Sequence, residues 1–263
     1  MISITPHPIA FTLFTIPIHW YGIIAALSFL IAWYSIPRIT RQIPKHILED
    51  AMILGVIFGI LGARLLHVIL LWKYYMAHPL LIPAVWNGGL AAFGGLLGGM
   101  LGVWLAARKH KADWLRIADS LAPWVFLAFA LGRIANILNG EILGTPCTCP
   151  FAFIFPDGIP RHPVQVYSML INIIIFLLGI ALLKRNAKRG VVLISTLTAY
   201  ATLRFIIEFF RNEPRILFML DPAQIALLLA LPLLIILLVR FSKDETFTPP
   251  SSSKQKSVKR KGE

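Results

Sequence analysis

The sequence predicts an all-α polytopic membrane protein with about seven transmembrane helices. The chain has 263 residues, of which 57% are hydrophobic and only 14% are charged, and its mean hydropathy is +0.75. A soluble domain could not bury so much apolar surface. The chain also divides into apolar stretches of about 20 residues, the length that crosses a bilayer as a helix. These stretches lie near residues 20–37, 51–72, 88–107, 117–138, 165–183, 190–210 and 222–241.

The basic residues are distributed unevenly between the connections, and this pattern predicts the topology. The net charge is +13, and 18 basic residues follow the first, third, fifth and seventh stretches, against four in the alternate connections. Because cytoplasmic loops carry the excess of Lys and Arg, we expect the N-terminus outside and the C-terminus in the cytoplasm. Residues 1–241 then form an integral membrane domain, and residues 242–263 form a disordered basic cytoplasmic tail. The charge indicates attraction to membrane lipids, and no nucleic-acid-binding motif accompanies it.

The first two stretches differ in their polar content. The first, 20–37, carries no charged residue, whereas the second carries Arg64, with His67 three residues further along the same helix face. A lone histidine in a membrane helix is more often a packing or hydrogen-bonding residue than a catalyst. Arg64 is harder to explain by packing, because a charged side chain in a bilayer is costly.

The third stretch is rich in glycine. Gly94, Gly98 and Gly102 recur at four-residue spacing, a pattern typical of helices that approach each other closely in lipid. Most of these glycines are therefore expected to be structural. Gly88 and Gly89 lie near the membrane edge, where glycine also lets the backbone come close to a ligand.

The fourth stretch ends in a strongly polar sequence. Its apolar part carries a single charge, Asp119, before Arg133 appears near its end. A charge deep in a membrane helix costs about 2.5–3.5 kcal/mol and usually acts on a substrate, ion or lipid. Arg133, Asn136 and Gly140 share one helix face, so we expect this end to bind an anionic or strongly polar group. The polar residues here are Arg133, Asn136, Asn139 and Glu141.

The fifth and seventh stretches are identified by apolar composition, but the sixth carries a polar stripe. Tyr200, Arg204, Glu208 and Arg211 recur at spacings of four, four and three residues along one helix face. An Arg204–Glu208 pair within the helix would neutralise itself for insertion. That interpretation does not explain why the pair is present, since apolar residues would insert at lower cost.

Three arginines at membrane depth, Arg64, Arg133 and Arg204, indicate a phosphate ligand. A guanidinium group matches phosphate oxygens with two parallel hydrogen bonds and keeps its charge in any environment. A phospholipid headgroup is the phosphate present at that depth.

The two cysteines, Cys147 and Cys149, lie in the connection between the fourth and fifth stretches. The predicted topology places this connection on the outer side of the membrane, which is oxidising, so a disulfide can form. A gap of one residue is nevertheless unfavourable for disulfide geometry. A metal site would need further ligands, and none lies nearby in the sequence. We therefore assign no chemistry to the pair, and nothing in the sequence requires a metal or an organic cofactor.

These segments resemble one known family, the prolipoprotein diacylglyceryl transferases. The family signature Gly-Arg-x-x-Asn-Phe-x-Asn-x-Glu-x-x-Gly stands here as residues 132–144, with Ile137 where phenylalanine is usual. The resemblance extends from residue 19 to about residue 240, with the segments in the same order and with the topology deduced above. The other matching segments are His19-Trp20-Tyr21-Gly22, Gly62-Ala63-Arg64, Trp86-Asn87-Gly88-Gly89, 161–167 and 204–211.

The resemblance implies an enzyme of the bacterial plasma (inner) membrane, so that residues 1–241 form a catalytic domain. Such an enzyme transfers the sn-1,2-diacylglyceryl group of phosphatidylglycerol to the lipobox cysteine of a prolipoprotein signal peptide. It forms a thioether and releases glycerol 1-phosphate, the first step of lipoprotein maturation. Its partners are phosphatidylglycerol, the prolipoprotein and membrane lipids, without nucleic acid, metal or cofactor.

The resemblance and the polar groups together predict the site. We assign the phosphate to Arg133 and Arg204, and expect Tyr21 to line the same cavity. Asn136, Glu141 and Glu208 would hold the arginines and contact the glycerol headgroup. The predicted catalytic residues are Arg133, Arg204, Glu141 and Glu208. The predicted substrate-binding residues are Arg133, Arg204, Asn136, Asn139, Tyr21, Arg64, Gly88 and Gly89.

The chain departs from the family where many members have a histidine that has been suggested as the catalytic base. Phe93 occupies that place, and Val164 and Ser168 replace a hydroxyl residue and an acid near the Gln-x-Tyr segment. The nucleophile is the substrate thiol, which reacts as the thiolate. The proton acceptor therefore stays open, as do the acyl-chain preference, the oligomeric state and the product exit route. Candidate acceptors are His19, His67, His162, Glu141 and solvent hydroxide.

One alternative class is a membrane transporter of an organic anion, since an arginine-lined route could pass such a solute. Inverted repeats, which are common in transporters, are not evident in the sequence. Intramembrane proteolysis and CDP-alcohol phosphotransfer are not supported, because their characteristic Ser, Asp or Asp-rich motifs are absent.

Overall fold

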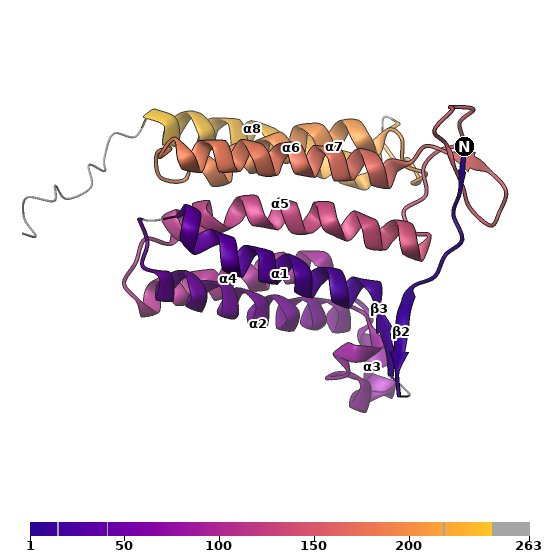
Figure 1. Cartoon of the computed structure of the whole chain (residues 1–263), viewed down its shortest axis with the longest axis horizontal. Helices are drawn as coiled ribbons and strands as arrows, with labels where there is room; N and C mark the ends of the chain where they lie inside the picture. Colours follow the sequence, from indigo (N-terminus) through magenta and orange to yellow (C-terminus); the bar gives the residue numbers. More distant parts are fainter. Residues whose placement is uncertain (15, 41, 218, 244–263) are drawn as a thin grey trace, which may run out of the picture.

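The structure is a computed structural model that describes residues 1–243 except 15, 41 and 218. It is largely helical, with small strands gathered at one end of the bundle (Figure 1). The tail predicted at residues 242–263 lies outside the described residues from position 244 onward. The helices are α1 (Trp20–Ile39), α2 (Lys45–Leu70), α3 (Trp72–Ala77), α4 (Ala92–Lys109), α5 (Trp114–Asn139), α6 (Val164–Lys184), α7 (Val191–Glu208) and α8 (Pro222–Lys243).

The prediction of a helical multi-pass membrane protein is confirmed in its coarse form. Within the described residues, six helices are long and apolar enough to cross a membrane, namely α1, α2, α5, α6, α7 and α8. Each of the seven predicted stretches contains a long helix. The third stretch becomes α4, which starts at Ala92 and not at Gly88, because Gly88 and Gly89 adopt left-handed backbone angles with φ of 78° and 73°.

The strands form two small sheets that the sequence patterns did not predict. β2 (Ile9–Leu13) and β3 (Ile16–His19) form an antiparallel hairpin immediately before α1. In the second sheet β1 (Ile2–Ser3) pairs in parallel with β4 (Phe153–Ile154), which pairs antiparallel with β5 (Pro160–Arg161). These strands are too short for a period-of-two pattern to stand out in the sequence.

Helix α5 lies between two groups of helices. Figure 1 shows α6, α7 and α8 on one side of it and α1, α2 and α4 on the other. It contacts α1, α4, α6 and α7. Side chains on α5 can therefore contact side chains from both groups of helices, so a site built from several helices can form around α5.

Asp119, the isolated charge of the fourth predicted stretch, has a structural role. Its side chain is 3% exposed and accepts hydrogen bonds from the backbone N–H groups of Gly190 (2.7 Å) and Leu193 (2.8 Å). Both N–H groups belong to the start of α7 and have no partner within that helix. Asp119 on α5 therefore caps α7 from a neighbouring helix and fixes the two helices to each other.

The glycine stripe of α4 packs directly on α2, as the small-residue pattern predicts. A Cβ atom at Gly94 would lie 2.2 Å from the carbonyl oxygen of Gly62, and one at Gly98 would lie 2.1 Å from that of Phe58. One at Gly102 would lie 2.2 Å from the carbonyl oxygen of Leu54. The two helices approach so closely that their backbones touch, which requires glycine at these positions.

We expect Gly98→Ala to destabilise the protein by about 1–3 kcal/mol, because the added methyl group must push α2 and α4 apart. The neighbouring Gly99→Ala is the matched control, since a Cβ there would lie 3.5 Å from the Gly55 carbonyl oxygen, an ordinary contact. Thermal unfolding of both variants in the same detergent measures the difference. Equal melting temperatures would contradict this account of the interface.

Candidate active site

The polar residues predicted at the end of α5 form one hydrogen-bonded cluster with the start of α1. The Tyr21 hydroxyl donates to Glu141 Oε2 over 2.7 Å, and the Asn136 amide donates to the same oxygen over 3.2 Å and also contacts the Tyr21 hydroxyl. Asn139 Nδ2 donates to the other oxygen, Glu141 Oε1, over 3.1 Å. Glu141 thus gathers Tyr21, Asn136 and Asn139 around one carboxylate.

The backbone explains why Glu141 meets residues that precede it in the chain. Helix α5 ends at Gly140, which takes the left-handed conformation with φ of 69° that glycine adopts without strain. The chain then turns back, and the Glu141 N–H donates to the Asn136 carbonyl oxygen over 2.9 Å. The Glu141 carbonyl oxygen in turn accepts from Gln165 Nε2 on α6 over 2.7 Å.

Arg133 joins this cluster through a neutral partner. Its Nη1 donates to Asn136 Oδ1 over 3.0 Å, while its Nε is buried without a hydrogen-bond partner among the described residues. No carboxylate in the described part of the chain forms a salt bridge with it. Instead, Arg133 interacts with the positive charges of Arg204 and Arg211. The guanidinium group therefore retains both positive charge and unused donor capacity.

The stripe on α7 forms a second cluster around Glu208, which is 1% exposed. Arg204 contacts the Glu208 carboxylate four residues on, and Arg211 Nη1 lies 3.0 Å from both of its oxygens. Arg211 also forms a 2.8 Å salt bridge with Glu213, whose side chain is 43% exposed. The predicted Arg204–Glu208 pair is therefore present, but the same carboxylate is shared with a second arginine.

Taken together, the two clusters hold three arginines and three carboxylates, but only one of those carboxylates, Glu208, is buried, whereas Glu141 and Glu213 are exposed. Arg204 and Arg211 share the Glu208 carboxylate, and Arg133 is close enough to both arginines to be repelled by their charge, while Glu141 is engaged by Tyr21 and the two amides. Arginines gathered in a low-dielectric environment with donors to spare attract an anion, and a phosphate group satisfies several of these donors at once. The arrangement fits a phosphate ester as the ligand.

Arg64 has a different position from the one its grouping with Arg133 and Arg204 suggested. Its guanidinium donates to the carbonyl oxygens of Ile82 (2.8 Å), Gly88 (2.6 Å) and Gly89 (3.1 Å), and also contacts that of Leu81. These bonds hold the segment that connects α3 to α4. Arg64 lines a cavity of 220 Å³, whose other lining residues are His67, Tyr74, Tyr75, Leu81, Gly88 and Gly89.

The two glycines of that segment are required by its geometry. A Cβ atom at Gly89 would lie 2.5 Å from His67 Nε2 and 3.0 Å from Arg64 Nη1. Gly88 and Gly89 therefore let the backbone reach the Arg64 side chain, and the three residues form one unit.

The candidate proton acceptors are scattered. Phe93, in the first turn of α4, is 76% exposed, and His67 packs edge-on against Tyr75 with ring centroids 5.9 Å apart. His162 lies beyond α5, where its Nδ1 is 3.1 Å from the Tyr167 hydroxyl. Glu141 is the candidate that lies inside the cluster with Arg133, through their shared contacts to Asn136.

Three residues that we did not predict as site residues hold the clusters or the chain beside them: Gln165 donates to the Glu141 carbonyl oxygen, Arg211 contacts Glu208, and Arg161 donates to the Gly144 carbonyl oxygen. Gln165 and Arg161 stand in the matched segment 161–167, and Arg211 stands in the polar stripe, so the sequence carried a signal for each. Arg161 Nη2 forms a 2.7 Å salt bridge with Asp157 and lowers the pKa of that carboxyl, with help from the Ile159 N–H. A lowered folded-state pKa keeps the pair intact at neutral pH and weakens it only in acid.

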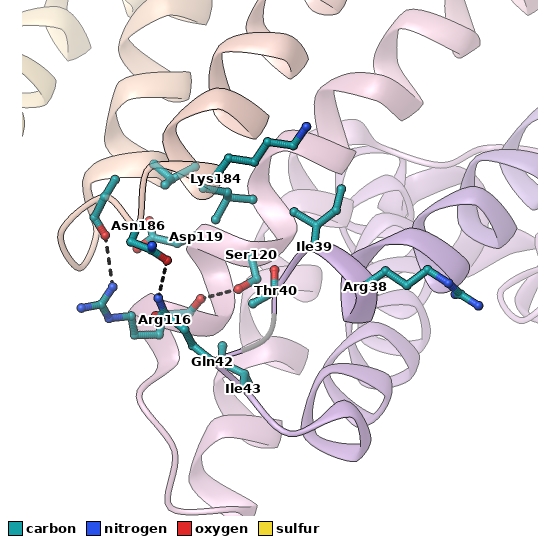
Figure 2. A pocket seen from close by; sticks show the side chains of 13 residues that line it. Arg38, Ile39, Thr40, Gln42, Ile43, Arg116, Asp119, Ser120, Lys184 and Asn186 are labelled. Atoms are coloured by element: carbon teal, nitrogen blue, oxygen red, sulfur yellow. Dashed lines mark hydrogen bonds between the residues drawn. The ribbon is translucent and has the colours of Figure 1, made fainter. Parts of the chain in front are cut away.

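A larger cavity of 340 Å³ lies at the opposite end of the bundle, where α1 and α6 end and α5 and α7 begin. Figure 2 shows that its polar groups bond to one another: Gln42 Nε2 donates to Asn186 Oδ1 over 2.7 Å, and Ser120 donates to the Arg116 carbonyl oxygen over 2.9 Å. The Arg38 side chain points away from the cavity and lies over the Tyr34 ring. This cavity has no part in the arginine cluster.

The fold and the site define a class of protein: a multi-pass membrane protein in which Arg133, Arg204 and Arg211 lie close to one another. The chain matches the family model for prolipoprotein diacylglyceryl transferase over residues 8–242. It therefore belongs to the prolipoprotein diacylglyceryl transferase family and is a transferase, as the motifs predicted.

Individual relatives agree with the family assignment. The chain is 35% identical over 243 residues to the phosphatidylglycerol–prolipoprotein diacylglyceryl transferase of Geobacter sulfurreducens, covering 88% of this chain and 93% of the relative. It is 35% identical over 250 residues to the protein of that name in Cupriavidus metallidurans, covering 87% and 90%. For the Nitrosomonas europaea protein the identity is 36% over 218 residues, covering 78% and 77%. The transporter alternative finds no support among these relatives.

Proposed function

We propose that this protein transfers the sn-1,2-diacylglyceryl group of phosphatidylglycerol to the lipobox cysteine thiol of a prolipoprotein. The relatives named for this reaction support the substrate pair, and the reaction forms a thioether and releases glycerol 1-phosphate. The single observation that carries the proposal is that Arg204 and Arg211 share one buried carboxylate, Glu208, while neighbouring Arg133 has no carboxylate partner among the described residues.

The chemistry explains why arginines suit this reaction. The substrate thiolate attacks the carbon that bears the phosphate oxygen, and the carbon–oxygen bond breaks. The departing phosphate changes from a diester with one negative charge to a monoester that gains a second. Guanidinium groups already in place stabilise the charge as it develops, without reorganisation during the reaction.

In this mechanism each cluster has a separate role. Arg133 and Arg204 bind the phosphate, and Glu208 holds Arg204 in position. Asn136 orients Arg133, while Glu141, Asn139 and Tyr21 form a polar surface that suits the hydroxyl groups of the glycerol headgroup. Arg64 acts with Gly88 and Gly89 by shaping the segment before α4. A metal or an organic cofactor has no step in this scheme.

We also propose the full topology, in which α4 is a seventh span, the N-terminus is outside and the C-terminus is cytoplasmic. Basic residues at the ends of α1, α4, α6 and α8 support this orientation, because all four ends would face the cytoplasm. The arginine site then lies at the outer side of the bacterial inner membrane, where an exported prolipoprotein presents its cysteine. Residues 1–241 form the catalytic domain, and the basic tail follows it.

The proposal is tested by mass spectrometry of a lipobox peptide incubated with the purified protein and phosphatidylglycerol. We expect a diacylglyceryl mass increase on the cysteine. Phosphatidylethanolamine, whose headgroup carries an ammonium group in place of the glycerol hydroxyls, serves as the control lipid and should give no product. If no product forms with phosphatidylglycerol, and a cooperative thermal unfolding transition shows that the protein is folded, the proposal is overturned.

A further inference from the structure

The connection between α5 and α6 gathers two cysteines and a histidine that the transfer mechanism does not use. Cys147 and Cys149 form a disulfide, and Cys149 Sγ lies 4.0 Å from His162 Nδ1. The two sulfur atoms and a ring nitrogen of His162 all lie within 4.8 Å of one another. Because the sulfurs are bonded to each other, they offer no thiolate to a metal ion in this state. Sulfur exchange is the chemistry that this state allows.

The segment that carries the pair is held firmly by backbone hydrogen bonds. The Cys147 N–H donates to the Pro160 carbonyl oxygen over 3.0 Å, and the His162 N–H donates to the Thr145 carbonyl oxygen over 3.0 Å. The Tyr167 hydroxyl, 3.1 Å from His162 Nδ1, fixes the imidazole ring beside the sulfurs. These hydrogen bonds therefore hold His162 next to Cys149.

The same segment is also attached to the arginine site. The Thr145 N–H donates to the Phe210 carbonyl oxygen over 2.8 Å, and the Asn212 N–H donates to that of Leu143 over 3.1 Å. These contacts join it to the residues that flank Arg211. Both cysteines are partly exposed, so a peptide thiol can approach them from outside. The substrate of this enzyme is itself a cysteine.

We propose that Cys147, Cys149 and His162 form a thiol–disulfide exchange site that acts on the cysteine of the prolipoprotein. The inference rests on the proposed function, which supplies a cysteine thiol as the substrate. Only a free thiolate can attack the lipid, and a cysteine in an oxidising compartment forms mixed disulfides with small thiols. A reduced pair beside the site restores such a cysteine to the form that reacts.

The exchange takes place in two steps. Cys149 gives its proton to His162 and attacks the small-thiol sulfur of the mixed disulfide, which releases the prolipoprotein cysteine as a thiolate. Cys147 then attacks the Cys149 sulfur, releases the small thiol and closes the Cys147–Cys149 disulfide seen in the structure. Two electrons pass from the pair to the substrate disulfide, and an external dithiol reductant returns the pair to the reduced state.

The test uses the full-length protein, reduced and then freed of reductant, with a lipobox peptide whose cysteine carries cysteamine in a mixed disulfide. We expect the wild-type protein to free the peptide thiol about tenfold faster than the double variant Cys147→Ser/Cys149→Ser, which measures background exchange. The single variant Cys147→Ser should accumulate a mixed disulfide at Cys149, visible as a mass increase on the protein. Equal rates for wild type and double variant, or no adduct on the single variant, would overturn the proposal.

Transfer to a peptide with a free cysteine is measured in the same preparations. The double variant should transfer the lipid group at the wild-type rate, because neither cysteine takes part in that reaction. A failure of transfer in both proteins would count against the proposed function, while the exchange rates would still be read independently. The two proposals can therefore fail separately.

Discussion

Arg133→Ala is expected to lower kcat for diacylglyceryl transfer by about 10²–10³-fold, the usual effect of removing one preorganised donor from a developing negative charge. Arg133 has unused donor capacity and no carboxylate partner among the described residues, so its charge is available to a phosphate. Arg133→Lys should lose most of the activity as well, because lysine keeps the charge without the planar fork. The rate of product formation on a lipobox peptide measures both effects.

A matched control for Arg133 is Arg38→Ala. Arg38 is also an arginine near a helix end, but it lies over the Tyr34 ring at the far end of α1. Its removal should leave kcat within about a factor of two, as for a surface change remote from the site. Activity of Arg133→Ala close to that of Arg38→Ala would remove Arg133 from the phosphate site.

Glu208→Gln is expected to reduce stability by about 3–5 kcal/mol, because it leaves two partly buried arginines, Arg204 and Arg211, without the fully buried carboxylate that they share. For a chain of this size we expect the melting temperature to fall by about 10 °C. Activity should fall too, since Arg204 loses the group that positions it. Thermal unfolding in detergent and the transfer rate are measured on the same sample.

Glu213 provides the comparison, because it contacts the same arginine from an exposed position. Glu213→Gln should change stability by only about 0–1 kcal/mol, the usual range for a surface ion pair. Adding Arg211→Gln to Glu208→Gln should recover part of the lost stability, since it removes one of the opposed charges. If Glu208→Gln melts at the same temperature as Glu213→Gln, the buried carboxylate does not carry the role assigned here.

The sequence predicted the helices and the cluster at the end of α5 because both depend on local patterns. Apolar stretches of spanning length identified the helices, and a polar sequence followed by Gly140 identified a helix end that gathers its own side chains. Residues at i and i+3 or i+4 are neighbours on any helix, so the Arg204–Glu208 pair could also be read directly.

What the sequence could not give are contacts between distant segments. Arg64 was grouped with Arg133 by residue type, yet its donors hold the carbonyl oxygens of residues 81–89, which no local pattern indicates. The sharing of Glu208 by Arg211 depends on how the chain turns after α7. His162 was not connected with the cysteines, because the return of the chain through β4 and β5 brings them together.

Helices α5 and α7 are joined along their length, by Asp119 at one end and by contacts of the Tyr200 ring with Phe126 and Phe129 further along. The arginines of the two helices are therefore held near one another before any ligand binds. Their mutual repulsion lowers the stability of the unliganded folded state. An anion that binds between them relieves it and stabilises the fold by mass action. During purification, a detergent that removes acidic lipid completely would therefore lower the stability of the protein as well as its activity.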